Sequence, residues 1–284
     1  MKMKRSEKLG MFTGLVVGVL LLLISVFMIF QTTCKVWGAE KPANATQQGI
    51  DVSSHQGKID WEQVKNSALA DYAIIRCGYG VNQTDKDDKY WDYNSSECER
   101  LGIPYGTYLY SGADTTAKAK SEAEHVVRLL QGKNLTYPIY YDMEADMLNQ
   151  LSSTQIGNIA KTFLNTMESY GYKNVAVYSN KYLFETKLTA SVFSDYPKWI
   201  AQHSNKCTYQ GSYHMWQYST QGVIPGISEK VDLNYKIGNW TYAGYSSAKK
   251  TVVVKPKATT IKSLRKSGKK AVKITYKKVS GVSG

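Results

Sequence analysis

The sequence has few residues that could bind a metal or cross-link the chain. Four cysteines and four histidines occur among 284 residues. No pair of cysteines has the spacing of zinc ligands, and the histidines are scattered, at positions 55, 125, 203 and 214. We therefore expect no zinc site, no other metal and no cofactor.

The scarcity of cysteine also limits disulfide bonding. Only Cys77, Cys98 and Cys207 lie in the central part of the chain, so at most one bond can form there. Cys77 ends a predicted strand and Cys98 lies on the next predicted helix, which makes them a conceivable pair. The connectivity cannot be deduced from the sequence.

Acidic residues are missing from the C-terminal end. Residues 246–284 contain twelve Lys and Arg and no acid, and residues 1–39 carry a net charge of +4. The total of +13 therefore leaves −3 for residues 40–245. A nucleic-acid-binding domain would carry its basic residues on the folded domain itself, so this class of partner is excluded for the central region.

One long run lacks charge altogether. Residues 10–30 are mostly apolar and follow four basic residues within the first eight positions. Such a run can span a bilayer as a helix, with its basic flank in the cytoplasm. Small residues near position 39 also offer a cleavage site, so residues 1–39 are predicted to be a signal anchor or a signal peptide. In both cases the chain after residue 40 is exported.

Strand-like and helical segments alternate through the central region, after a polar linker at residues 40–48. The eight strand-like segments are 49–53, 72–77, 105–110, 138–143, 174–179, 198–202, 213–218 and 231–235. Helical patterns occupy residues 61–69, 89–101, 115–131, 153–170 and, more briefly, 180–188. Asp60 and Ser153 are the predicted N-caps of the first and fourth of them. This alternation predicts a parallel β/α barrel over residues 49–242. Because little room for helices remains after residue 190, we expect the barrel to be incomplete, with about five helices.

The stretch YPIYYDMEAD at residues 137–146 carries the most chemical information. Asp142 and Glu144 lie two positions apart at a predicted strand end, so their side chains share one face. Mutual repulsion pushes one of two close carboxyls toward a raised pKa and a general-acid role, which is the layout for glycosidic-bond cleavage. An exposed acidic turn is the alternative. Asp146 has the same parity but lies past the expected end of the strand.

Two further carboxylates are expected beside this pair. Reactive residues of β/α barrels lie at the C-terminal ends of the strands. Asp51 lies on the first predicted strand and Asp232 on the last, and these strands are neighbours when a barrel closes. Four carboxylates are therefore predicted to converge on one mouth. For Asp51 and Asp232 taken singly, a loop cap and a turn residue are the alternatives.

Aromatic residues are abundant, with 22 Tyr and 6 Trp. Sugar rings stack on aromatic faces, and tyrosine adds a polar tip. The candidates for sugar contact near predicted strand ends are Tyr108, Tyr110, Tyr141, Trp216 and Tyr218. Packing within the barrel is the alternative for each of them.

Four separated segments resemble the family 25 glycoside hydrolases, the N-acetylmuramidases of the cellosyl type. They are GIDVSSHQG at 49–57, YYDMEAD at 140–146, MWQY at 215–218 and VDLNY at 231–235. The resemblance covers residues 48–240. It implies a modified β/α barrel that cleaves the β-1,4 bond between N-acetylmuramic acid and N-acetylglucosamine in peptidoglycan.

The resemblance also implies roles for individual residues. Glu144 would be the general acid that protonates the leaving oxygen. Asp142 would stabilise positive charge at the anomeric carbon, directly or by orienting the acetamido group of the substrate. Asp51 and Asp232 would complete an acidic floor. The matched segment MWQY adds Gln217 to the expected sugar contacts, beside Trp216 and Tyr218.

The second strand departs from the family pattern. Many relatives carry a Lys followed by a Ser/Thr-Glu-Gly element, whereas this chain reads IIRCGYG at residues 74–80. Arg76 keeps the positive charge, but the glutamate is missing. The departure concerns the substrate subsites and leaves the four carboxylates unchanged.

Residues 243–284 have a different character, rich in Thr, Lys and Val. Strand-like alternation around a Gly turn resembles the opening of a fibronectin type III-like module, so we expect a basic linker and the first two strands of an incomplete module. The basic charge could attract anionic wall polymers. A solvated linker is the alternative.

The expected protein is a peptidoglycan hydrolase outside the cytoplasm, secreted to the cell wall or held at the membrane by residues 10–30. Two other functions stay open, a non-catalytic glycan-binding surface protein and a chitinase-like glycosidase. The presence of all four expected carboxylates favours an enzyme.

Overall fold

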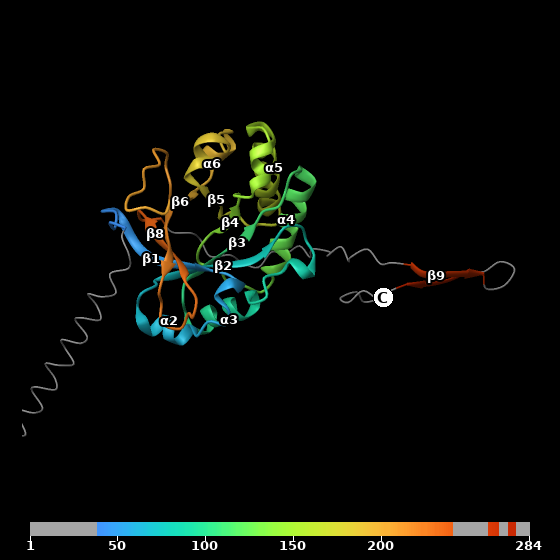
Figure 1. Cartoon of the computed structure of the whole chain (residues 1–284), viewed down its shortest axis with the longest axis horizontal. Coiled ribbons are helices and arrows are strands. Elements are labelled where there is room, and N and C mark those ends of the chain that lie inside the picture. The colour runs from blue at the N-terminus through green and yellow to red at the C-terminus, as the bar shows by residue number, and fades with distance from the viewer. Residues whose placement is uncertain (1–38, 241–260, 267–271, 277–284) are drawn as a thin grey trace, which may run out of the picture.

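A computed structural model describes residues 39–240, 261–266 and 272–276. Eight strands form one closed barrel in chain order (Figure 1). They are β1 (Ala45–Val52), β2 (Tyr72–Tyr79), β3 (Tyr105–Tyr110), β4 (Ile139–Asp142), β5 (Val175–Asn180), β6 (Lys198–Ala201), β7 (Met215–Gly222) and β8 (Val231–Ile237). All eight predicted strands are confirmed.

The last strand breaks the parallel order of the barrel. Strands β1 to β7 run parallel to their sequence neighbours. Strand β8 is antiparallel to both β7 and β1. The expectation of an all-parallel barrel is therefore wrong at this strand. The physical reason is the connection at residues 223–230, which is shorter than the dozen or more residues that a parallel crossover needs.

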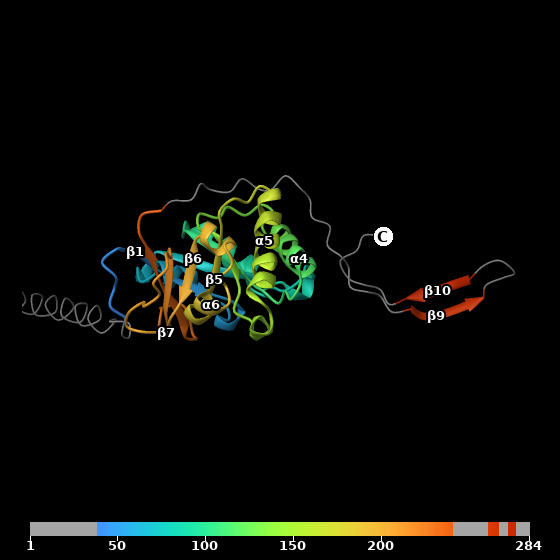
Figure 2. The same ribbon diagram turned by 90° about the horizontal axis from the view of Figure 1, so that it is seen from above.

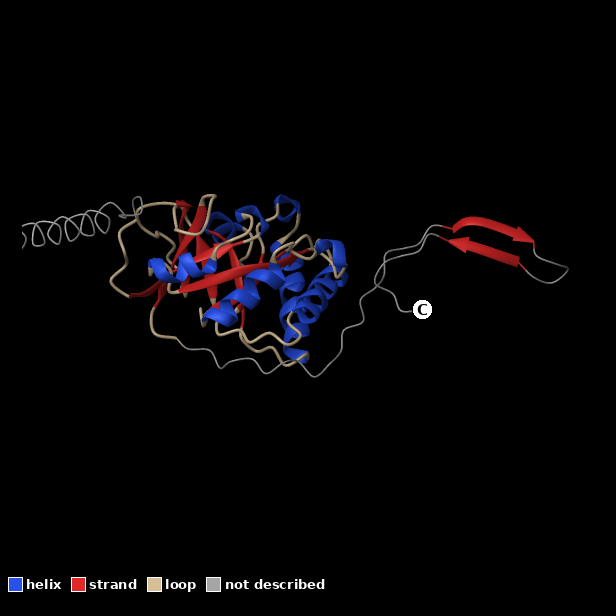
Figure 3. Cartoon of the chain, turned by 90° about the horizontal axis from the view of Figure 1, so that it is seen from below, coloured by secondary structure: helices blue, strands red, loops and turns tan. Residues whose placement is uncertain are grey.

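Six α-helices lie in the parts of the chain that the structure describes. They are α2 (Trp61–Ser67), α3 (Trp91–Leu101), α4 (Thr116–Leu129), α5 (Ser153–Ser169), α6 (Lys181–Thr186) and α7 (Val192–Asp195). Each of the five predicted helical segments contains one of them, and α7 was not predicted. Figure 2 shows α4 and α5 side by side, and Figure 3 shows the helices outside the strands of the barrel. No helix connects β6 to β7 or β7 to β8, so the barrel is incomplete in its helices and not in its sheet.

The helix ends follow local chemistry. The side chain of Asp60 accepts a hydrogen bond from the backbone N–H of Gln63 at the start of α2, as predicted for an N-cap. At α5 the cap is Ser152 and not the predicted Ser153, because Gln155 completes a capping box with Ser152. Gly102 ends α3 with a φ of 66°, a left-handed conformation that glycine adopts without strain.

Side chains alternate across the wall of the barrel. Outward-facing residues join the helices in the main apolar core, as Val177 and Phe163 do. Inward-facing side chains form a second apolar cluster, and we call its aromatic members the aromatic plug, namely Tyr72, Tyr137, Tyr140, Tyr178 and Trp199. The ring of Trp199 lies 4.9 Å from that of Tyr140 and 4.4 Å from that of Tyr178. The plug closes one end of the barrel and leaves its other end for polar side chains.

The conceivable disulfide is not formed. Cys77, Cys98 and Cys207 are all free. Cys77 and Cys98 are fully buried in the outer core, and burial raises the pKa of the Cys77 thiol to about 12. The Cys77 Sγ lies 3.3 Å from the carbonyl oxygen of Tyr108, so it points along the sheet toward β3.

Both chain ends extend beyond the described barrel. The predicted membrane segment at residues 10–30 lies outside the described residues. Within the described parts, no helix has the length and apolar character needed to cross a membrane. Toward the C-terminus, β9 (Ile261–Lys266) pairs antiparallel with β10 (Val272–Tyr276), which confirms two strands in that segment.

Candidate active site

Four carboxylates meet at the open end of the barrel. Asp51 lies near the end of β1, Asp142 ends β4 and Glu144 follows it. Asp232 is the second residue of β8, and it pairs in register with Asp51. Because β8 is antiparallel, its N-terminal end lies beside the C-terminal ends of the parallel strands. The structure thus brings together the carboxylates that the sequence placed at one mouth.

Strand alternation points the pair on β4 inward. Tyr140 belongs to the aromatic plug, and Asp142 and Glu144 continue the same face. Asp146 does not join them, because it begins the 3-10 helix η3 (Asp146–Gln150) and is exposed.

The four carboxyl groups differ in exposure. Asp142 and Asp51 retain only 3% and 5% of their surface, whereas Glu144 and Asp232 are half-buried. Asp51 and Asp142 therefore form the floor of the mouth, and Glu144 and Asp232 face its opening. Burial is the main cause that raises the pKa of each carboxyl. The nearby Asp51 charge raises the pKa of Glu144 further, and the pKa of Asp232 rises to about 6.

Two amide side chains hold the Asp51–Asp232 pair. Asn234 Nδ2 donates to Asp51 Oδ2 at 2.7 Å. Gln217 Nε2 donates to Asp51 Oδ2 at 3.0 Å and to Asp232 Oδ2 at 3.3 Å. These bonds favour the charged form of Asp51, whereas burial and the Asp232 charge raise its pKa well above the usual range. The two carboxyls therefore resist ionising together.

The Gln217 amide has partners at both ends. Its N–H₂ can only donate and so faces the carboxylate oxygens of Asp51 and Asp232. Its Oε1 then accepts from the hydroxyl of Tyr178 at 2.9 Å and lies 3.0 Å from Nε2 of His203.

The indole of Trp199 fixes the orientation of the Asn234 amide. Its Nε1 donates to Asn234 Oδ1 at 2.8 Å. Tyr178, His203, Trp199 and Asn234 were missed in the sequence. One signal was available for Asn234, which stands two positions after Asp232 on a strand and so shares its face.

Asp142 has a different environment. Its Oδ1 is buried without a hydrogen-bond partner in the described part of the chain. Glu144 and Asp51 add to the effect of burial in raising the pKa of Asp142, and the Arg76 charge opposes them. A buried oxygen without a partner is costly, so its presence at this place indicates a group used for something other than stability.

Two of the predicted sugar-contact tyrosines lie with the carboxylates. Tyr108 and Tyr110 alternate inward on β3 and are half-buried. Burial and the charge of Asp142 both raise the pKa of Tyr110. The Asp51 and Asp142 charges likewise raise the pKa of Tyr108 beyond the effect of its burial. Both rings therefore border the acidic mouth.

Three other predicted contacts are wrong, namely Tyr141, Trp216 and Tyr218. Tyr141 stacks on Phe163 at 3.8 Å, and its hydroxyl donates to Glu122 at 2.6 Å. All three belong to the buried outer core, where a glycan cannot reach them. The reason is strand parity, because each of them neighbours a residue that points inward, Asp142 or Gln217.

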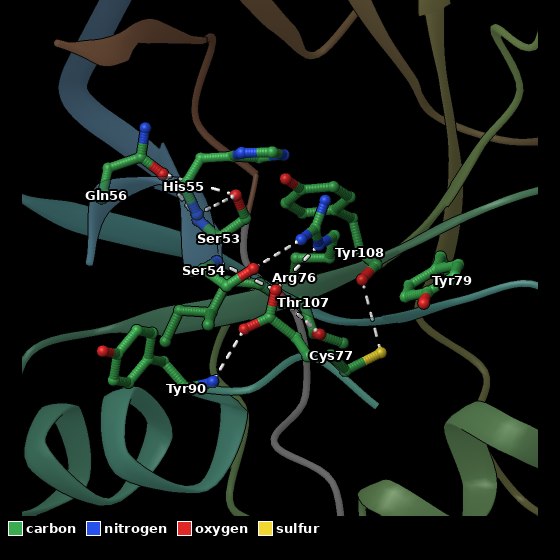
Figure 4. Close-up of polar contacts among 12 residues, drawn as sticks. Ser53, Ser54, His55, Gln56, Arg76, Cys77, Tyr79, Tyr90, Thr107 and Tyr108 are labelled. Carbon is green, nitrogen blue, oxygen red and sulfur yellow. Dashed lines mark hydrogen bonds and ion pairs between the residues drawn. The ribbon is translucent and has the colours of Figure 1, made fainter. Parts of the chain in front are cut away.

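The charge of Arg76 has a partner that comes from elsewhere in the chain. Its Nε donates to Asp88 Oδ2 at 2.8 Å, and its Nη2 donates to Ser54 Oγ at 2.9 Å (Figure 4). Asp88 lies twelve residues after Arg76. The carboxylate that pairs with Arg76 thus comes from the loop after the second strand.

Residues 50–227 match the model of the glycosyl hydrolases family 25. The chain is 30% identical over 188 residues to the autolytic lysozyme of Clostridium acetobutylicum, an alignment that covers 66% of this chain and 55% of that protein. It is 28% identical over 201 residues to lysozyme M1 of Streptomyces globisporus, with 66% of each chain covered.

A solved structure supports the same relationship. The modular autolysin LytC from Streptococcus pneumoniae superposes with a TM-score of 0.61 at 33% identity, over 66% of this chain and 46% of that one. This chain thus spans about half the length of the pneumococcal and clostridial relatives. The family match covers well over half of the chain and three of its four site carboxylates, namely Asp51, Asp142 and Glu144. The chain therefore belongs to the glycosyl hydrolases family 25, and its barrel is a glycoside hydrolase domain.

Proposed function

We propose that this protein is a peptidoglycan hydrolase that cleaves the β-1,4 bond between N-acetylmuramic acid and N-acetylglucosamine. The observation that carries the proposal is the convergence of four carboxyl groups on one mouth of the barrel. Relatives named as lysozymes and an autolysin support the substrate class. The pneumococcal autolysin has also been solved with a synthetic peptidoglycan ligand.

Glu144 is the general acid in this proposal. A general acid must hold its proton near neutral pH and must reach the leaving oxygen. Burial raises the pKa of Glu144, so its proton is retained to higher pH than in a free glutamate. Its side chain is half-buried and so keeps contact with the opening of the mouth. The fully buried Asp142 is less suited to that task.

Asp142 acts beneath it on the reacting sugar. Its unpartnered Oδ1 can accept a hydrogen bond from the acetamido N–H of the substrate or face positive charge at the anomeric carbon. Arg76 favours the charged form that either role requires. Gln217 holds Asp51 on the floor and Asp232 at the opening, and Tyr108 and Tyr110 supply the faces on which sugar rings stack.

The assignment of Glu144 is tested by Glu144→Gln assayed on purified cell walls. We expect binding to persist while release of reducing ends falls at least about 100-fold, the usual contribution of a general acid. Asp146→Asn is the matched control, since it removes an exposed carboxylate two residues further along and should change little. Unchanged release by Glu144→Gln would contradict the assignment.

The bond is identified by mass spectrometry of the products. A new reducing end on N-acetylmuramic acid supports the proposal. A reducing end on N-acetylglucosamine, or a clear preference for chitin over peptidoglycan, would contradict it. Wall binding by the wild type without any release of reducing ends would instead indicate a glycan-binding module.

The enzyme is proposed to work outside the cytoplasm, at the cell wall. Residues 1–39 would export the barrel and, if uncleaved, hold it at the membrane through residues 10–30. The basic segment 246–284 would attract anionic wall polymers. Deleting that segment should leave hydrolysis of soluble glycan intact and weaken retention on walls at low salt. Equal retention with and without it would remove this role.

A further inference from the structure

Arg76 is the one guanidinium at the acidic mouth among the described residues. It alternates inward on β2, in register with Tyr108 on β3, and its charge acts on Asp142. The other two arginines of residues 39–240 are engaged elsewhere, Arg100 with Glu97 on α3 and Arg128 with Asp87. A cation in a site dominated by carboxylates calls for an explanation.

The anchoring of Arg76 leaves part of its guanidinium free. Nε is bound to Asp88 and Nη2 to Ser54. Nη1 has no partner within the described protein, and the side chain keeps 16% of its surface exposed. Figure 4 shows Ser54 on one side of the guanidinium, with the rings of Tyr108 and His55 on the other. The guanidinium therefore lies beside Tyr108, whose ring borders the acidic mouth.

Asp88 pairs with Arg76 and is also held by the backbone. It is 5% exposed and already accepts from the backbone N–H groups of Ser54 and Tyr90, each at 2.9 Å, as well as from Arg76. Those bonds lock Asp88 and hold the guanidinium rigidly beside the mouth. A rigid arginine presents its remaining donors in one direction, which suits a planar carboxylate.

The charge of the mouth limits what the free donors can bind. Four nearby carboxyl groups repel an anionic ligand, so an anionic substrate group needs a cation placed for it. An uncharged glycan such as chitin offers no group that requires one. A glycan built from muramic acid carries a lactyl carboxylate, which is free where the stem peptide is absent, and stem peptides carry carboxylates of their own.

We propose that Arg76 binds a carboxylate of the substrate and thereby selects acidic glycans over neutral ones. This inference rests on the proposed function and adds to it the residue that recognises a carboxylate of the substrate. The shared chemistry is a carboxylate, from the lactyl group or from the stem peptide. Arg76 is thus a specificity residue that contacts the substrate while Glu144 performs the proton transfer.

Three soluble oligosaccharides of equal length separate the sources. The first is a peptide-free glycan with free lactyl carboxylates, the second is the same glycan with those carboxylates converted to amides, and the third carries stem peptides. Wild type and Arg76→Gln are compared on each by kcat/KM. Arg76→Gln should lose about 10- to 100-fold more on a carboxylate substrate than on the amide, the range for a hydrogen bond to a charged group, because any loss through Asp142 is common to both substrates.

Two further variants protect the test against misfolding. Arg76→Gln leaves Asp88 buried without its cation, so Arg76→Gln with Asp88→Asn removes both charges together. Arg76→Lys keeps the charge and should retain part of the preference for the carboxylate. Thermal melting followed by circular dichroism confirms that each variant is folded.

Binding to the Glu144→Gln variant, measured by calorimetry, gives a readout that does not depend on cleavage. The peptide-free or the peptide-bearing carboxylate glycan should bind more tightly than the amide, and Arg76→Gln in that background should abolish the difference. Equal losses on charged and neutral glycans would overturn the role of Arg76 and leave the proposed function standing. Failure of the wild type to cleave any of the three would contradict the proposed function, while the binding preference would still decide the role of Arg76.

Discussion

Two buried carboxyl groups lie on opposite sides of β4 and have different surroundings. Glu122 of α4 is behind the strand, fully buried, and accepts from Ser111 Oγ at 2.9 Å, from the Tyr141 hydroxyl at 2.6 Å and from the Gly112 N–H at 2.8 Å. Asp142 is in front of the strand, nearly as buried, and its Oδ1 has no partner in the described protein. Burial raises the pKa of both groups.

The comparison teaches that a raised pKa does not by itself distinguish a catalytic carboxyl from a structural one. Hydrogen bonding separates them. The hydrogen bonds of the Glu122 oxygens connect α4 to β4 and to the loop after β3, so they stabilise the fold. The free oxygen of Asp142 is available to a substrate.

The strongest test of this difference is Asp142→Asn. Loss of a charge that faces the reacting sugar should lower the rate of wall hydrolysis by about 100- to 1000-fold. The free energy of unfolding at neutral pH should stay the same or rise, because a neutral amide no longer repels Glu144 and Asp51. Release of reducing ends and urea unfolding measure the two quantities. Wild-type activity of Asp142→Asn would show that Asp142, like Glu122, is not needed for catalysis.

The converse substitution is Glu122→Gln. Its N–H₂ group must face either the Gly112 N–H or the two hydroxyl groups, so at least one buried donor loses its acceptor. We expect the free energy of unfolding to fall by about 1–3 kcal/mol. The activity of the folded enzyme should stay within about 2-fold of wild type. A folded Glu122→Gln that no longer cleaves walls would show that Glu122 also serves catalysis.

Tyr141→Phe sharpens the comparison from the strand between the two carboxyls. It removes one hydrogen bond to Glu122 and should reduce the free energy of unfolding by about 1 kcal/mol. KM for soluble glycan should not change, because the ring is buried against Phe163. Tyr110→Phe is the matched control at the mouth, where a rise in KM without a stability loss is expected. A rise in KM for Tyr141→Phe would show that Tyr141 contacts the sugar, which its burial in the structure excludes.

The smallest expected effect concerns pH and Asp232. Burial raises the pKa of this carboxyl from 3.8 to about 6 in the folded protein. The folded state therefore binds the proton more tightly than the unfolded chain, so the stability that Asp232 contributes is complete below pH 4 and is lost as the pH rises through 6. Asp232→Asn should raise Tm by about 1–3 °C at pH 7.5 and not at pH 4. Equal gains at both pH values would contradict the assigned shift.

Much of the fold was predictable because its signals are local. The apolar runs and the caps of the helices depend on residues a few positions apart, and they indicated all eight strands and five helices. The inward direction of Asp142 and Glu144 followed from the two-residue period of a strand. The same period could have excluded Tyr141, since it stands next to Asp142 and must point the other way. Proximity to a strand end was the wrong criterion for that residue.

The rest depended on contacts between distant parts of the chain. The direction of β8, the contacts of the Gln217 amide with Tyr178 and His203, and the pairing of Arg76 with Asp88 each join segments that no local pattern links.

The sequence by itself therefore determined the elements, the inward face of β4 and the four acidic residues, because side-chain periodicity and residue chemistry act along the chain. Only the tertiary structure decided which carboxyl is saturated, which oxygen is free and where the one guanidinium of the mouth points. Those properties arise from hydrogen bonds and burial, which exist only after the barrel has closed.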